Sequence, residues 1–320
     1  MNNEIKKYSE LETAILKTLA FFDIFDYPLT LLELYKWLYQ APANVKFSDL
    51  AESFESANLA GIIDHQSGFY FFPGRSNIVR TRLNRYRIAE GKFSIALKLA
   101  AWLRPIPFIR MVAVCNNAAY DNANDQSDID FFIVIKSGRI WLTRFLVTTL
   151  ASLLRFRRHG RKITDRVCLS FYLTDDHLNL SAVALKPFDP YLVYWSATLA
   201  PIYGLDTYRR FIKDNAWLVP WLPNISGVNL AGRRQVTDSR LTLFVRRTWE
   251  GLLGGFLGDW CSAILKFVQL KKMQLNKTSV ASQPDTRVIV SDVMLKFHEG
   301  DKRAQYYELW LRRLQSLEIL

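Results

Sequence analysis

The pattern of apolar and polar residues divides the chain into helical and extended stretches. Apolar residues recur at helical spacing over 11–22, and Pro28 then ends this stretch because its ring nitrogen has no hydrogen to donate. Similar spacing predicts helices over 31–39 and about 48–60. Two apolar runs around a glycine-containing turn predict a β-hairpin over 61–72. Three helices and a hairpin are therefore expected at the N-terminus.

The middle of the chain combines one long helix with short apolar strands. Residues 77–103 predict a single helix with arginines crowded into its first half, and two prolines soon afterwards would end it. Strongly apolar runs follow over 109–115, 131–135 and 166–173. Runs of this length and composition are typical of strands in a buried sheet.

The remainder of the chain is rich in prolines and aromatic residues, which favours helices packed through aromatic rings. A helix is expected over about 241–274, and its glycine-rich stretch 251–258 would allow close packing. The most apolar stretches are 140–154 and 249–268, but charged residues interrupt both of them. We therefore predict no transmembrane segment.

Two carboxylates precede the second of the expected strands. In the run Ser127-Asp128-Ile129-Asp130, alternate residues of an extended chain project from one side, so Asp128 and Asp130 would point together. Adjacent carboxylates repel unless a cation lies between them, and Mg²⁺ prefers oxygen ligands that it can share with a triphosphate. The run predicts a Mg²⁺ site; the alternative is that it only caps a strand or turn.

This run resembles the signature of the nucleotidyltransferase superfamily, which is built on the DNA polymerase β-like fold. The signature is a Gly-Ser pair, a short helix or loop, and Ser-Asp-x-Asp opening an apolar strand. Asn116 and Asn117 stand here where the family has Gly and Ser. The resemblance implies that Asp128 and Asp130 are catalytic Mg²⁺ ligands and that Asn116, Asn117 and Ser127 bind the nucleotide. Asn tolerates the left-handed backbone that glycine would adopt.

The resemblance also implies a third carboxylate on a later strand. The expected strand 166–173 holds no acid. Alternation puts Cys168, Ser170 and Tyr172 on one face, so Ser170 or Cys168 would stand in the acid's place. Asp165 before the strand or Asp175 after it could supply the third ligand. Otherwise the carboxylate triad is incomplete, and such a site could bind nucleotide without turning it over.

The charge balance is basic, and several cations are candidates for contacts with phosphate. The chain has 42 Lys and Arg against 30 Asp and Glu, a formal charge of +12. This balance favours contact with polyanions, although it could simply aid solubility. Arg144 could neutralise a triphosphate. The densest basic run, 155–166, could receive a triphosphate or a nucleic-acid acceptor, or form a solvated loop. His298 could lie near the site or be structural.

Cysteine usage and the first residues bear on localisation. Cys115, Cys168 and Cys261 are far apart and form no paired motif, so neither a zinc site nor a disulfide framework is indicated. Residues 1–10 are polar and unlike a signal peptide. We expect a reducing, cytoplasmic location.

These observations predict an α+β protein in four parts. Residues 1–75 resemble a winged helix, 76–104 form a connecting helix, 105–185 form a nucleotidyltransferase-like mixed sheet with helices, and 186–320 form an α-helical accessory region. The helix expected over 48–60 carries three carboxylates and no Lys or Arg, which disfavours insertion into a DNA groove.

Three functional hypotheses remain open. The first is a Mg²⁺-dependent nucleotidyltransferase that moves a nucleoside monophosphate from ATP or another nucleoside triphosphate to a protein, nucleic-acid or other acceptor. The second is a degenerate, non-catalytic nucleotidyltransferase fold that binds nucleotide or a partner. The third is a DNA-binding regulator.

Overall fold

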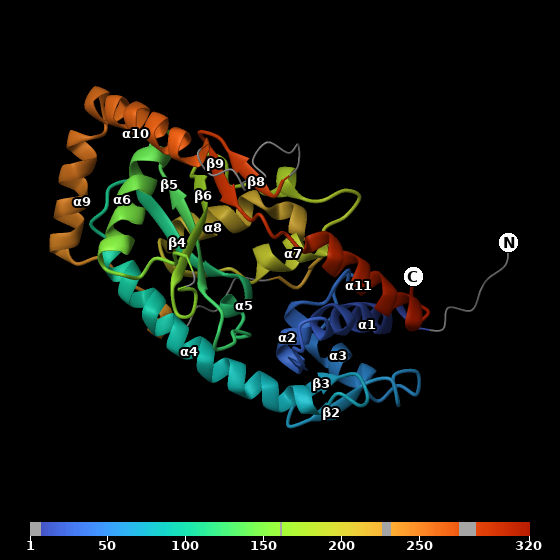
Figure 1. Cartoon of the computed structure of the whole chain (residues 1–320). Coiled ribbons are helices and arrows are strands. Elements are labelled where there is room, and N and C mark those ends of the chain that lie inside the picture. Colours follow the sequence, from blue (N-terminus) through green and yellow to red (C-terminus); the bar gives the residue numbers. More distant parts are fainter. Residues whose placement is uncertain (1–7, 161, 226–231, 275–285) are drawn as a thin grey trace.

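A computed structural model describes residues 8–160, 162–225, 232–274 and 286–320 (Figure 1). It is a mixed α+β protein with a three-stranded sheet and a six-stranded sheet. Most of the first ten residues, which were expected to lack a signal peptide, lie outside this description.

The N-terminal part contains the helices and the hairpin that the pattern predicts. Its elements are α1 (Glu10–Asp23), β1 (Leu29–Thr30), α2 (Leu31–Lys36), α3 (Phe47–Ser53), β2 (Asp64–Gln66) and β3 (Phe69–Phe71). The three strands form an antiparallel sheet in the order β1-β3-β2. α2 and α3 are shorter than predicted. Leu38 and Leu59 lie beyond the ends of these helices but are buried, so the apolar pattern in the sequence continues past the last helical hydrogen bonds.

Helix α4 (Asn77–Leu103) joins the N-terminal part to the larger sheet, as predicted (Figure 1). At its start, Ile78 and Val79 pack with Phe71 of the hairpin. Its second half contributes Phe93 and Leu99 to the core beside the sheet. One helix therefore fixes the hairpin and the sheet relative to each other.

The larger sheet has the strand order β7-β4-β5-β6-β9-β8. Its strands are β4 (Ile109–Cys115), β5 (Ile129–Ile135), β6 (Val167–Thr174), β7 (Ala200–Tyr203), β8 (Val288–Val290) and β9 (Met294–Phe297). β5 and β6 are parallel, and the other neighbouring pairs are antiparallel. The parallel pair needs a crossover, which α6 (Ile140–Leu153) provides.

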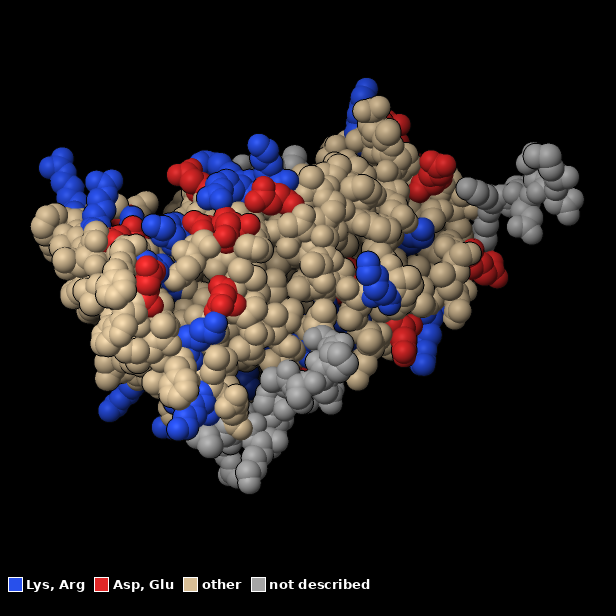
Figure 2. Space-filling model, turned by 90° about the horizontal axis from the view of Figure 1, so that it is seen from above, with Lys and Arg blue, Asp and Glu red and all other residues tan. Residues whose placement is uncertain are grey.

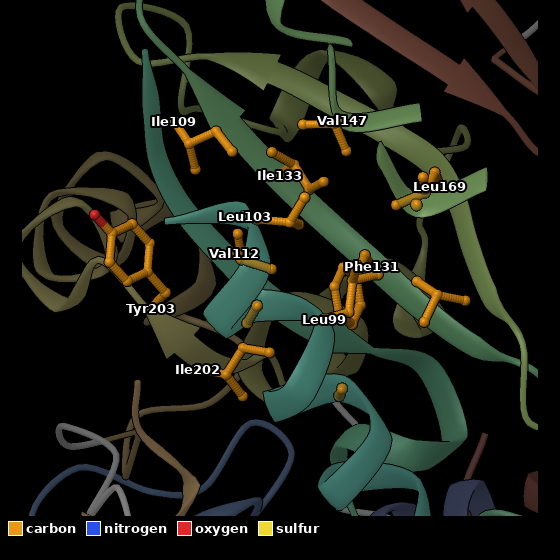
Figure 3. Packing of buried hydrophobic residues seen from close by; sticks show 14 of the residues in the cluster. Leu99, Leu103, Ile109, Val112, Phe131, Ile133, Val147, Leu169, Ile202 and Tyr203 are labelled. Atoms are coloured by element: carbon orange, nitrogen blue, oxygen red, sulfur yellow. The ribbon is translucent and has the colours of Figure 1, made fainter. Parts of the chain in front are cut away.

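Two helical layers cover the two faces of this sheet. α4 and α6 cover the face that receives Ile129, Phe131 and Ile133, while α7 (Pro190–Ala197) and α8 (Leu205–Asp214) cover the face that receives Phe132 and Val134. Figure 3 shows the first of these layers, with labelled side chains Leu99, Leu103, Ile109, Val112, Phe131, Ile133 and Val147. The alternation follows from the period of two along a strand, and it puts Asp128 and Asp130 on the α7 side.

The expectation of a purely α-helical region over 186–320 is wrong. β7, β8 and β9 extend the sheet at both edges, and each has only three or four residues, too few for a period-two pattern to show. The last helix, α11 (Arg303–Ser316), returns to the N-terminal part, where the Trp310 indole donates to the Lys17 carbonyl at 2.9 Å.

The expected helix over 241–274 is two helices, α9 (Arg240–Leu252) and α10 (Phe256–Gln274), which meet at 86°. The glycines permit the bend: a Cβ added to Gly258 would lie 1.8 Å from the Leu253 carbonyl oxygen. In the described residues, no single helix is long and apolar enough to cross a membrane, and this bent pair passes the length and composition test only when its two helices are taken together.

Candidate metal and nucleotide site

The carboxylate pair lies at the start of β5, as predicted. Asp128 precedes the strand, Asp130 is its second residue, and Ile129 between them is fully buried on the opposite face. One carboxylate oxygen from each aspartate and the Cys168 sulfur lie within 4.8 Å of one another. Burial, reinforced by the charge of Asp128, raises the pKa of Asp130 above its usual range. A cation between the two carboxylates would relieve that repulsion.

Asn116 begins α5 (Asn116–Ala119) with a φ of 58°, the left-handed conformation expected where the resembling family has glycine. Its side-chain amide donates to the Asp130 carboxylate at 2.8 Å, and its side-chain oxygen accepts from the Trp195 indole at 2.8 Å. Asn116 therefore orients Asp130. Asn117 points elsewhere, since its side-chain oxygen accepts from the Tyr120 hydroxyl at 2.7 Å.

Cys168 is the β6 residue paired with Asp130 across the parallel ladder. This is one of the two positions where the third acid was expected. A bulge follows, because the next pairing joins Phe132 to Phe171. The extra residue leaves both Ser170 and Phe171 on the site's face, and it moves Tyr172 into the core on the opposite face. Simple alternation had grouped Tyr172 with Cys168 and Ser170, and that grouping is wrong.

Neither aspartate proposed as a third ligand joins the pair. Asp175 follows the far end of β6, where its amide donates to the Ile135 carbonyl at 2.9 Å. Asp165 lies nearer, but its carboxylate accepts from Lys92 at 2.8 Å. The Lys92 ammonium is almost fully buried and also donates to the Ser127 carbonyl at 2.7 Å. Through these two bonds, Lys92 holds Asp165 and Ser127 together and fixes the loop before β5.

Arg144 lies on the wrong face of the sheet for the predicted phosphate contact. It belongs to α6, and its guanidinium bonds to Gln269 and lies over the rings of Tyr172 and Phe297. The carboxylates face α7 instead. The sequence placed Arg144 after the strand correctly, but it could not show which face α6 covers.

Arg158 is the cation that the structure brings to the pair. Its guanidinium donates to the Asp128 carboxylate at 2.6 Å. Its backbone amide donates to the Val167 carbonyl at 2.9 Å, which holds this part of the basic run beside β6. Despite partial burial, the bond to Asp128 raises the pKa of Arg158. The charge of the run 155–166 marked it as a candidate for phosphate contact, but the sequence did not single out Arg158 within that run.

A cavity of about 620 Å³ adjoins the pair. Its lining comes from three regions and consists of Asn116, Asp130, Arg158, Cys168, Ser170, Phe171, Val183, Tyr191, Leu192, Trp195, Lys296, Phe297, His298, Glu299, Gly300, Asp301, Lys302, Arg303 and Tyr306. One wall holds Asp130 and Arg158, and α7 supplies an aromatic wall. The end of β9 and the segment after it supply a third wall, in which cations and carboxylates are mixed.

The third wall contains His298, for which the sequence left two alternatives open: a position near the site or a structural role. The structure brings it to the cavity, with its Nε2 3.4 Å from the Ser170 hydroxyl. Burial, together with the charge of Lys296, lowers the pKa of His298 to about 4. Burial and the neighbouring Arg303 lower the pKa of Lys296 to about 8. His298 is therefore neutral at pH 7.

Arg303 anchors this wall to α7. Its guanidinium forms ion pairs of 2.8 Å with both Asp189 and Asp301, and it donates to the Val183 carbonyl at 2.9 Å. The Arg303 and Asp189 side chains are only 6% and 2% exposed. The contacts with Asp189 and Val183 join residues more than a hundred positions apart, so local sequence patterns gave no sign of them.

Comparisons of the chain with protein-family models, with curated proteins and with solved structures found no match.

Proposed function

We propose that the protein is a Mg²⁺-dependent nucleotidyltransferase that acts on ATP or another nucleoside triphosphate. The observation that carries the proposal is the cavity itself: Asp130 lines it, and the neighbouring Asp128 pairs with Arg158, which also lines it. A carboxylate pair with a cation beside one cavity suits a ligand that is itself anionic and arrives with a divalent cation.

The residues present fit Mg²⁺ better than a softer metal. Mg²⁺ is commonly held in proteins by one or two carboxylates, with water and substrate phosphates completing its shell, so Asp128 and Asp130 are sufficient. Cys168 adds little as a ligand, because burial and the charge of Asp130 raise the pKa of its thiol to about 12. When bound, the ion would offset charge on the triphosphate as the α-phosphorus is attacked.

The chain's own groups supply orientation and charge. Asn116 holds Asp130, and Arg158, which pairs with Asp128 and lines the cavity, would contact a phosphate of the bound ligand. In the reaction, an acceptor oxygen bonds to the α-phosphorus, the bond from that phosphorus to the bridging oxygen breaks, and pyrophosphate leaves. The acceptor's proton goes to solvent. The aromatic rings of Tyr191 and Trp195 offer a surface for the nucleobase.

A second function, nucleotide binding without turnover, is favoured by one observation. Neither Cys168, which pairs with Asp130, nor Ser170 is a carboxylate, and these are the two positions where the resemblance implies a third acid. On this alternative the N-terminal helices and hairpin, which resemble a winged helix, would respond to the bound nucleotide.

The experiment incubates the full chain with Mg²⁺ and each of the four nucleoside triphosphates labelled at the α-phosphate. Pyrophosphate release and label transfer are measured beside calorimetric binding. Transfer that is lost in Asp130→Asn, but kept in Asp125→Asn on the exposed preceding loop, supports the transferase. Binding without pyrophosphate release supports the second function. No Mg²⁺-dependent binding of any triphosphate contradicts both.

A further inference from the structure

The two helices α9 and α10 carry large apolar side chains on their outward faces. Phe256 is 86% exposed, Phe244 69% and Phe267 67%. The exposed apolar face consists of Leu241, Phe244, Trp249, Leu252, Phe256, Leu257, Trp260, Ile264, Phe267 and Val268. Its members on α10 follow helical spacing, so they form a continuous stripe.

Polar side chains hold α9 against the protein, and they fix which way it faces. Glu250 accepts from the Arg110 guanidinium at 2.8 Å and from the Phe108 amide at 2.7 Å. Arg246 pairs with Asp238 at 2.9 Å. α9 has no fully buried residue, and its ion pairs lie on the inner side.

α10 also uses polar contacts on its inner side, although Leu265 and Leu270 pack against the core there. Gln269 is buried against α6, where its amide donates to the Trp141 carbonyl at 2.9 Å. Asp259 pairs with the buried Arg139 at 2.5 Å. A helix on a water-facing surface normally buries its apolar side and exposes its polar side. The large apolar side chains that both helices leave on the outside indicate that this outward face meets something other than water.

Positive charge surrounds the apolar face. Residues 239–274 contain six basic and two acidic residues, and both acids, Glu250 and Asp259, are neutralised in the ion pairs just described. Arg240, Arg247, Lys271 and Lys272 are exposed. In Figure 2 the left-hand end, where α9 and α10 lie, is mostly tan with blue side chains at its edges. Trp249 and Trp260 add amphipathic rings to the face.

We infer that α9 and α10 dock on an anionic lipid bilayer, with Phe244, Phe256 and Phe267 entering the region between headgroups and acyl chains. Exposed apolar side chains with flanking cations and tryptophans are the chemistry of helices that lie in a membrane interface. A second copy of the chain fits this face less well, because two-fold pairing would bring one basic rim against another. The ion pair from α9 to Arg110 on β4, and the one from α10 to Arg139 at the start of α6, keep both helices on the surface.

The test is flotation of the full chain with vesicles of phosphatidylcholine alone or with about one third phosphatidylglycerol. We expect binding to the anionic vesicles that weakens as salt rises. The double substitution Phe256→Ser with Phe267→Ser should lower the partition coefficient by more than about tenfold, since two large apolar side chains no longer leave water. Lys271→Glu with Lys272→Glu should lower it by about tenfold.

The matched control is Leu32→Ser on α2, where an equally exposed apolar side chain (66%) lies outside this face, and its binding should not change. Far-ultraviolet circular dichroism establishes that each variant is folded. Failure of the wild-type chain to float with anionic vesicles at low salt overturns the inference. So does unchanged binding by the phenylalanine variant. Sedimentation equilibrium that shows a dimer abolished by the same two substitutions also overturns it and assigns the face to a second copy.

Discussion

Substitution of His298 by glutamine should reduce the protein's acid sensitivity. The His298 ring lies in the cavity wall, and no described partner bonds to its Nδ1. Burial, with the charge of Lys296, lowers its pKa from 6.5 to about 4. Between these two values the unfolded chain binds a proton that the folded chain does not. The contribution of His298 to stability is therefore complete above pH 6.5 and is lost as pH falls toward 4.

The magnitude follows from the two pKa values. At pH 7.5 the histidine is neutral in both states and makes no difference. At pH 4.5 the unfolded state is favoured by about 2.5 kcal/mol through this single group. Wild type should therefore lose about 2.5 kcal/mol more than His298→Gln between pH 7.5 and pH 4.5.

The assay is urea unfolding followed by circular dichroism at several pH values, with metal chelated throughout. His65→Gln on the exposed hairpin strand β2 is the matched control, and its free energy of unfolding should follow the wild-type pH dependence. Parallel curves for wild type and His298→Gln would refute the reasoning. That result would mean that the ring is hydrated or repositioned when it is protonated.

Three further substitutions test the contacts around the site. Lys92→Met removes the buried ammonium that holds Ser127 and Asp165, and it should cost about 2 kcal/mol in urea unfolding, whereas Lys98→Met on the exposed side of α4 should cost little. Asp189→Asn breaks a buried ion pair and should lower stability by about 3 kcal/mol; a neutral result would show that Arg303 is held by Asp301 alone. Cys168→Asp supplies a third carboxylate, which should tighten calorimetric Mg²⁺ binding by about tenfold and destabilise the metal-free protein. Weaker Mg²⁺ binding would contradict the placement of the metal at Asp128 and Asp130.

The site joins residues from three separated regions of the chain, and its order depends on a small number of buried polar contacts. Lys92 fixes the loop before β5, Asn116 orients Asp130, and Arg303 ties the segment after β9 to α7. Each contact satisfies a charged or polar group away from water, so each loss is costly. Substitutions at these positions should therefore disturb ligand binding together with stability.

The sequence by itself determined the features that depend on neighbouring residues. The spacing of Asp128 and Asp130 at a strand start put both carboxylates on one face, and Asn116 is one of the few residue types that tolerate the left-handed backbone found there. The end of α4 followed from the two prolines after it. Such features are local because strand alternation and helix termination involve only a few consecutive residues.

Only the tertiary structure decided which distant groups meet. Arg144 and Arg158 are both cations near the motif in sequence, but α6 covers one face of the sheet and the carboxylates lie on the other. A one-residue bulge in β6 changed the face of Tyr172. His298 reached the cavity because β9 pairs with β6. Long-range pairing of this kind depends on how whole helices and strands pack, and the short-range periodicity of the sequence does not predict it.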